Sequence, residues 1–406
     1  MRFLCKFACL PLVALAFGGV RELESKAIEL KSKGDAAGAL AAYRQAAALD
    51  PKSARLEDEI GFLLAVLNRR EEAILHFKHA LDLDLKFAPA HYHLGVALAI
   101  AQGPEQAIPQ LQSAAALDPK NGEYQARLGE ALLSVDQGDQ LDGAIAALRS
   151  ASILRPKDAA NWSRYGLALQ KTGDLMGALE AYRHQVDLEP SDNEARNRLG
   201  IALVNTRRAD EGIAQFKKVL AADPSNNTAR LNIAFAHIQK RELDQAITVL
   251  RDLIVRDPQN APAHYNLGVA LKTKDDIDAA KAEFARAVAI DPTLAEAHYM
   301  FGIACWQSGE FEQAAQAMRA AIAERPDYAE AYFMLGTALK QKGDLAPAEE
   351  ALRSAIRLDP ANPGPYNTLG QVLRQKGNLE ESKQMFAEGA RVKAAKENEL
   401  GTMERK

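Results

Sequence analysis

The sequence has few cysteines, three among 406 residues, and two of these, Cys5 and Cys9, stand near its N-terminus. Small secreted domains that depend on disulfides carry many more, so a disulfide framework is excluded. The third, Cys305, has no histidine and carboxylate at a spacing that would make it a nucleophile. We therefore interpret Cys305 as a small buried hydrophobic residue and expect no nucleophilic catalysis.

The chain also lacks an excess of either charge. It has 50 Lys and Arg residues against 54 Asp and Glu, a formal net charge of −4. This balance gives no general attraction to phosphate backbones or anionic lipid surfaces, so binding to nucleic acid is not expected. The 48% of hydrophobic and 26% of charged residues are ordinary for a folded chain. They exclude extensive disorder and a protein with several membrane spans.

Motifs for cofactors are missing as well. The glycines occur singly, never as a G-x-G-x-x-G loop between a strand and a helix, so a nucleotide site is not expected. Of the eight histidines, His91, His264 and His298 recur at one place in a repeated pattern where aromatic residues stand elsewhere. We interpret them as packing residues and expect no metal, no cofactor and no enzymatic activity.

One hydrophobic run is present, at the N-terminus. Two basic residues lie within the first six, an apolar stretch follows over residues 7–17, and Ala16 and Gly18 satisfy a small-x-small cleavage rule. This layout predicts a signal peptide at residues 1–18 and export to the periplasm or outside the cell. The run is shorter than the ~20 residues of a bilayer span and contains Pro11, so no stable span is expected after cleavage. The alternative is a hydrophobic cap on the first helices of a cytoplasmic protein.

A proline recurs with a fixed step of 34 residues through most of the chain. Ten residues after each proline stands a small residue, glycine in every case but Ala234, and a large, mostly apolar residue stands twenty-six residues after each. The prolines are Pro156, Pro190, Pro224, Pro258, Pro292, Pro326 and Pro360. Such regular spacing indicates an internal repeat.

A 34-residue unit with small, large and proline positions in this order resembles the tetratricopeptide repeat, whose unit is two antiparallel helices. The resemblance implies an all-α, right-handed superhelical solenoid. We expect eleven repeats and about twenty-two helices over residues 20–396, followed by a charged tail at 397–406. The units are 20–53, 54–87, 88–121, 122–158, 159–192, 193–226, 227–260, 261–294, 295–328, 329–362 and 363–396.

Packing explains the pattern when the positions are numbered from 1 within each unit. Small residues at positions 8 and 20 let the two helices approach closely, and proline at position 32 cannot continue the second helix. Each pair has an apolar face that only a neighbouring pair can bury. The fourth unit has three additional residues, in the segment 135–143, where we expect a longer loop between its helices.

In proteins of this family, positions 2, 5, 6, 9 and 12 of the first helix line a concave groove. The resemblance therefore implies a row of partner-binding residues at position 6: Arg127, Arg164, Arg198, Asn232 and Asn266. This row is partly similar to the carboxylate-clamping repeats of chaperone cofactors and to the asparagine ladder of the O-GlcNAc transferase superhelix. Arg can hold a carboxylate through two parallel hydrogen bonds, and Asn can pair with a peptide backbone. The row predicts an extended peptide partner with acidic residues at about every third position.

The alternative is that the arginines only pair within their own helices. Arg127 follows Glu123 by four residues and Arg198 follows Glu194 by four, the spacing of ordinary helix-surface ion pairs. Arg164 has an alanine at that spacing, so we expect it to be unpaired and to be the strongest candidate.

Aromatic side chains share the same helix face. We expect them to form apolar sub-pockets for the partner, although aromatic residues at helical spacing also pack between neighbouring helices. They are Tyr92, Tyr265, Tyr299 and Phe333 at position 5 and Trp306 at position 12.

The sequence thus predicts a non-catalytic scaffold or adaptor that binds an extended peptide or a partner protein. The alternative is an exported assembly factor, or a chaperone-like holder of membrane or secreted client proteins, whose groove would favour apolar segments over acidic ones.

Overall fold

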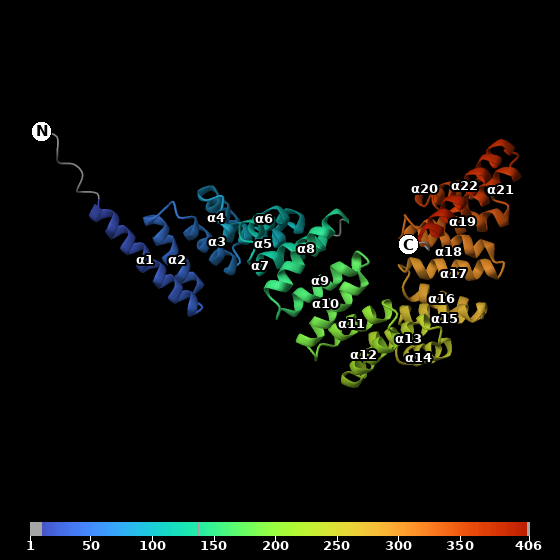
Figure 1. Ribbon diagram of the computed structural model, residues 1–406, viewed down its shortest axis with the longest axis horizontal. Coiled ribbons are helices and arrows are strands. Elements are labelled where there is room, and N and C mark those ends of the chain that lie inside the picture. The colour runs from blue at the N-terminus through green and yellow to red at the C-terminus, as the bar shows by residue number, and fades with distance from the viewer. Residues whose placement is uncertain (1–9, 136–137, 404–406) are drawn as a thin grey trace. The chain divides into compact units, whose positions relative to one another are not determined.

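The computed structural model describes residues 10–135 and 138–403 of the chain. These residues form 22 α-helices and no strand, which confirms the all-α class (Figure 1). The first eleven helices are α1 Leu10–Ser32, α2 Ala36–Leu49, α3 Ala54–Val66, α4 Arg70–Leu83, α5 Ala88–Gln102, α6 Pro104–Leu117, α7 Gly122–Val135, α8 Gly138–Leu154, α9 Ala159–Lys171, α10 Leu175–Leu188 and α11 Asn193–Asn205. The others are α12 Ala209–Ala222, α13 Asn227–Gln239, α14 Leu243–Arg256, α15 Ala261–Thr273, α16 Ile277–Ile290, α17 Ala295–Gln307, α18 Phe311–Glu324, α19 Ala329–Lys342, α20 Leu345–Leu358, α21 Pro363–Gln375 and α22 Leu379–Met403.

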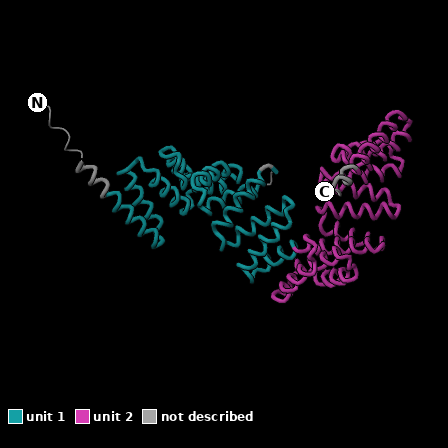
Figure 2. The backbone as a smooth tube through the Cα atoms, in the orientation of Figure 1, with its two compact units in different colours: residues 1–202 teal, residues 203–406 magenta. Residues whose placement is uncertain are grey.

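The chain forms two compact units, residues 1–202 and 203–406, with the boundary inside α11 (Figure 2). Within unit 1 the helices α1 to α10 pack in succession, each against the next, and α12 to α22 do the same within unit 2. Odd-numbered helices also contact one another across pairs, from α3 to α9 in unit 1 and from α13 to α21 in unit 2. In each unit the first helices of the pairs therefore form a layer of their own.

The ends of the helices have identifiable chemical causes. The helix α14 stops at Arg256, where the backbone N–H of Asp257 still donates to Leu253, and Pro258, which has no N–H, cannot extend the helix. The side chain of Asn260 then accepts the backbone N–H of Ala263 at 3.0 Å and caps α15. An acid, a proline and a capping residue in this order explain why the second helix of one pair ends and the next pair begins.

In most of the described pairs the turn has a left-handed residue at position 15, whereas in the third pair Gly103, at position 16, has the positive φ. Gly173, Gly309 and Gly343 adopt φ values of +83°, +78° and +87° at position 15. Glycine takes this conformation without steric cost. Arg241 adopts the same conformation, with φ +60°, so the repeated geometry also holds where the sequence has a larger residue.

Close contact between the two helices of a pair depends on position 8, as predicted. A methyl group at Gly268 would lie 2.6 Å from Cε1 of Phe284, and one at Gly336 would lie 2.5 Å from Cγ of Leu352. Both large side chains have no exposed surface. The glycine on the first helix thus leaves room for the large side chain on the second.

The structure corrects one expectation, that the fourth unit has a longer loop. The helix α7 ends at Val135 and α8 begins at Gly138, and α8 has 17 residues where α10 has 14. The additional residues lengthen the second helix at its N-terminus, because each residue added to a helix gains a backbone hydrogen bond. Residues 136–137 of that segment lie outside the described residues.

The two ends of the chain are helical where they are described. Residues 1–9 of the predicted signal peptide and residues 404–406 of the predicted tail lie outside the described residues. The helix α1 starts at Leu10, inside the predicted signal peptide, and α22 continues to Met403. In the part of the chain that the structure describes, no helix is both long and apolar enough to cross a membrane.

Candidate functional site

All ten predicted partner-binding residues lie on odd-numbered helices. The boundary between the units divides the row, so the residues form two sets. Unit 1 holds Tyr92 on α5, Arg127 on α7, Arg164 on α9 and Arg198 on α11, and unit 2 holds Asn232 on α13, Tyr265 and Asn266 on α15, Tyr299 and Trp306 on α17 and Phe333 on α19.

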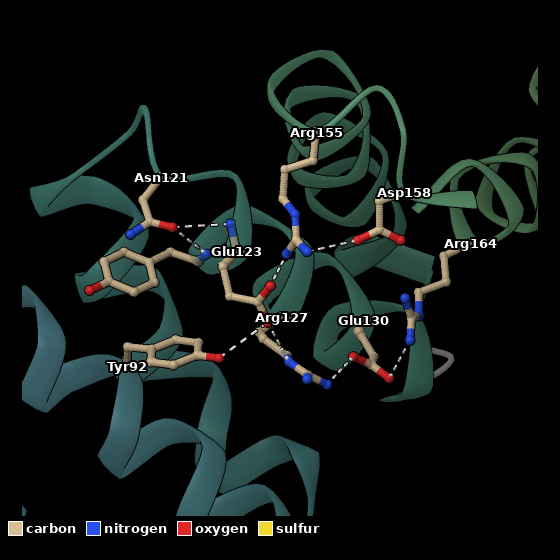
Figure 3. Close-up of polar contacts among 9 residues, drawn as sticks. Tyr92, Asn121, Glu123, Arg127, Glu130, Arg155, Asp158 and Arg164 are labelled. Carbon is tan, nitrogen blue, oxygen red and sulfur yellow. Dashed lines mark hydrogen bonds and ion pairs between the residues drawn. The ribbon is translucent and has the colours of Figure 1, made fainter. Parts of the chain in front are cut away.

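In unit 1 a single carboxylate connects two of the arginines (Figure 3). Arg127 donates from Nη1 to Oε2 of Glu130 at 3.0 Å, and Arg164 donates from Nη2 to Oε1 of the same side chain at 3.1 Å. Arg127 also donates from Nε to Oε1 of Glu123 at 3.1 Å. Two neighbouring odd helices, α7 and α9, are thereby joined through Glu130.

The expectation that Arg164 is unpaired is wrong. Its partner Glu130 stands 34 residues earlier, on the preceding odd helix. Comparing charges four residues apart on one helix therefore does not identify this pair. Opposite charges separated by one repeat length are the signal that would have identified this pair. The helix-surface pairs Glu123–Arg127 and Glu194–Arg198 do form, as the alternative predicted.

Arg198 contacts the odd helix before it through a neutral group. It donates from Nη1 to Oγ of Ser163 at 2.7 Å, and its other terminal nitrogen pairs with Glu194. Position 6 therefore reaches back to the preceding odd helix at both Arg164 and Arg198, with a charged contact in the first case and a neutral one in the second.

A second carboxylate, that of Glu123, gathers further polar groups at the edge of the site. Tyr92 donates its hydroxyl to Oε1 of Glu123 at 3.2 Å, and Arg155 pairs with the same carboxylate. Arg155 also pairs with Asp158 at 3.1 Å. The sequence did not predict that Glu123 and Arg155 belong to one network. Glu123 lies in the first turn of α7 and Arg155 directly follows α8, so the two residues are a whole helix pair apart in the sequence.

The positive and negative charges of the network are equal in number. It contains three arginines, Arg127, Arg155 and Arg164, and three acids, Glu123, Glu130 and Asp158 (Figure 3). Burial lowers the pKa of Arg127, but Tyr92 and Glu130 more than offset this, so the net shift of that pKa is upward. Arg127 therefore stays positive at any physiological pH.

None of the predicted partner-binding residues of unit 2 carries a charged side chain. Tyr265 lies 6.0 Å from the ring of Phe284, and Tyr299 lies 5.0 Å from that of Tyr328. Burial raises the pKa of Tyr265 and of Tyr299, and that of Tyr328 to about 12. All three phenols are thus neutral near pH 7.

The other residues of this set are half-buried. Phe333 and Trp306 pack against the buried core of α17 to α21. Two donors, Nδ2 of Asn232 and Nε1 of Trp306, are buried and have no hydrogen-bond partner among the described residues. Packing between neighbours, the alternative predicted for the aromatic residues, accounts for part of their surface.

The histidines at position 4 are packing residues, as predicted for His91 and His264, which are both buried. Their role is more specific than packing. His264 Nε2 lies 3.2 Å from the carbonyl oxygen of Pro258, six residues earlier, and that oxygen can only accept, so Nε2 carries the hydrogen. Trp162 makes the same contact with Pro156 at 3.0 Å and Arg196 with Pro190 at 3.1 Å. The side chain at position 4 therefore stabilises the turn that precedes each of these helices, through a hydrogen bond to a backbone carbonyl of that turn.

Within the described residues, no group of three or more His, Cys, Asp or Glu side chains is placed to hold a metal ion.

Comparison with known protein families gives matches along much of the chain. Three models, all described as tetratricopeptide repeat, match residues 164–227 and 299–363, residues 203–271, and residues 261–294 and 364–396. No curated protein sequence matches the chain.

Among solved structures, the crystal structure of MamA is 27% identical over 41% of this chain and 97% of its own, with a TM-score of 0.40. YrrB, described as a TPR protein with an unusual peptide-binding site, is 21% identical over 46% of this chain and 95% of its own, with a TM-score of 0.43. The human IFIT1 dimer with m7Gppp-AAAA is 17% identical over 84% of this chain and 90% of its own, with a TM-score of 0.44.

Proposed function

This chain belongs to the tetratricopeptide repeat family, and from that premise we propose that it is a non-catalytic scaffold that binds an extended peptide or partner protein along its odd-numbered helices. The first helices of the pairs form a continuous layer within each unit, so equivalent positions recur at regular intervals along it. A partner in extended conformation can meet several of them at once.

The observation that carries the proposal is the row of arginines at position 6 in unit 1. The side chains of Arg127, Arg164 and Arg198 are 45%, 32% and 38% exposed. Each is long enough to turn from its internal partner to an external one, and a guanidinium binds a carboxylate through two parallel hydrogen bonds. Packed helices lie ~8–10 Å apart, close to the length of three extended residues. The preferred partner therefore carries acidic residues at about every third position.

The face of unit 2 supports a second candidate function, the holding of apolar client segments. Its position 6 carries Met300 and Met334 after the two asparagines, beside the aromatic residues described above. Methionine and aromatic side chains adapt to varied apolar surfaces.

Charge reversal tests the main proposal. A fluorescein-labelled peptide with Glu at every third position and Ser or Thr between is titrated with the wild-type chain and with the variant Arg164→Glu/Arg198→Glu, and binding is followed by fluorescence anisotropy. The variant is expected to bind at least about tenfold more weakly, with unchanged helicity by circular dichroism.

The matched control is Arg149→Glu/Arg183→Glu, which makes the same change of charge on the even helices α8 and α10. It is expected to keep wild-type affinity. Equal affinity of the wild-type chain and the variant Arg164→Glu/Arg198→Glu would refute the role of the arginine row.

We also propose that residues 1–18 direct export of the chain. The basic start, the apolar run and the small residues before position 19 support this. Expression in a bacterium that has an outer membrane, followed by mass spectrometry of the periplasmic fraction, should find a chain that begins at Gly19. A full-length chain that remains in the cytoplasm would contradict the proposal.

A further inference from the structure

Glu130 lies between two arginines of the predicted partner-binding row. Each of its two oxygens accepts from a different arginine, at 3.0 Å from Arg127 and 3.1 Å from Arg164 (Figure 3). This is the arrangement that an acidic side chain of a bound peptide would adopt between two neighbouring odd helices.

The sequence places this carboxylate where no other unit has a charge. Position 9, which Glu130 fills, carries an apolar or neutral polar residue in each of the other ten units: Ile28, Phe62, Val96, Leu167, Ile201, Phe235, Val269, Ile303, Thr337 and Gln371. The exception stands in the first of the two units that have arginine at position 6 and are followed by another arginine there; the second of these units has Leu167 at position 9. Glu130 is thus the one position-9 carboxylate beside the arginine row.

The contacts of Glu130 can be exchanged. Its side chain is 40% exposed, and those of Arg127 and Arg164 are exposed to a similar degree. Ion pairs that remain in contact with water are weak individually, so a competing carboxylate can replace one of the partners without unfolding the helices.

We infer that Glu130 is an internal substitute for the partner's carboxylate, and that an acidic partner binds the Arg127–Arg164 site by displacing it. The inference rests on the proposed function and adds a regulatory property to the same site. While Glu130 is in place, the network is electrically neutral and attracts an isolated acidic residue only weakly. A partner with several correctly spaced acidic residues also pairs with Arg198, and this additional ion pair offsets the free energy lost when Glu130 is displaced.

The substitution Glu130→Gln tests the inference, because Gln has nearly the same shape and lacks the charge. With the same labelled Glu peptide, Glu130→Gln is expected to bind about three- to thirty-fold more tightly than the wild-type chain at low salt. The gain should shrink as ionic strength rises, since it is electrostatic. A peptide with Gln in place of Glu should show no gain.

Glu180→Gln is the matched control, because Glu180 also pairs with an arginine, Arg183, but lies on the even helix α10. It makes the same change of net charge and is expected to leave the affinity unchanged. The double variant Glu130→Gln/Arg164→Glu should not show the higher affinity for the Glu peptide, because Arg164, which Glu130→Gln leaves without its partner, is then absent.

The outcomes separate the two proposals. If charge reversal at Arg164 and Arg198 weakens binding but Glu130→Gln leaves it unchanged or weakens it, the role of Glu130 as an internal competitor is wrong and the arginine row stands. If charge reversal has no effect, the row itself does not bind the peptide, and the inference fails with it. An equal gain in Glu180→Gln would show a general effect of charge and would also overturn the inference.

Discussion

Burial sets the chemistry of Cys305 on α17. The residue has no exposed surface, and burial, with a further contribution from the charge of Glu310, raises the pKa of its thiol from 9.0 to about 11. The folded chain therefore holds this proton more tightly than the unfolded chain. The resulting stabilisation is complete below about pH 9 and is lost as the pH rises toward 11.

Labelling kinetics check this assignment. In a Cys5→Ser/Cys9→Ser chain at pH 8, maleimide should modify Cys305 at least roughly 100-fold more slowly in the folded state than in denaturant, because the thiolate is the reactive form. Mass spectrometry at timed intervals measures both rates. Similar rates would mean that α17 opens readily or that the thiol is not buried.

Side-chain partners on other helices were the least predictable part of the site. The pairs Glu123–Arg127 and Glu194–Arg198 could be predicted because a helix fixes the distance between residues four apart. The contact of Arg164 with Glu130 depends on how two odd helices lie side by side, which helical periodicity alone does not specify. The position of each candidate on its helix was predictable from the repeat, but its partner was not.

At the scale of the helix pair, the glycine at position 8 decides how closely the two helices pack. Gly268→Ala should destabilise the chain by about 1–3 kcal/mol, because the added methyl group would meet the ring of Phe284 at 2.6 Å. Chemical denaturation followed by circular dichroism measures the change. A neutral result would mean that α15 and α16 can separate at little cost.

Gly143→Ala is the control for Gly268→Ala. Gly143 also lies inside a helix, α8, but its nearest neighbour, Cδ1 of Leu132, would be 3.4 Å from the new methyl group. The substitution is expected to stabilise the chain by about 0.5–1 kcal/mol, the ordinary advantage of alanine over glycine in a helix.

Most helix boundaries followed from the sequence, because the repeat marks them chemically. The odd helices α3 to α21 each begin at the first residue of a predicted unit. The exceptions arise where the pattern is interrupted. The three additional residues of the fourth unit extend α8, since nothing in that segment stops a helix, and α1 starts ten residues before the first predicted unit.

At the scale of the whole molecule, stability is expected to be local, because each helix contacts only its near neighbours within a unit. Leu267, on α15 in unit 2, is buried. Its truncation, Leu267→Ala, should cost about 2–5 kcal/mol. The loss should fall mainly on unit 2.

The two tryptophans can report this separately, since Trp162 lies in unit 1 and Trp306 in unit 2. In chains that keep one tryptophan, with the other replaced by Phe, Leu267→Ala should lower the denaturation midpoint seen by Trp306 more than that seen by Trp162. An equal shift of both midpoints would show that the whole chain unfolds as one cooperative body.

The hydrogen bond from position 4 to the carbonyl six residues earlier joins one helix pair to the pair before it. His264, Trp162 and Arg196 supply it with three different side chains, because a main-chain oxygen accepts from any suitable donor. The acceptor lies near the end of the preceding unit, where a main-chain oxygen is present whatever the residue. A pair excised or duplicated in register would therefore find its acceptor in its new neighbour and would require no matching change. The array can thus grow or shrink by whole modules, through recombination in nature or by splicing in the laboratory.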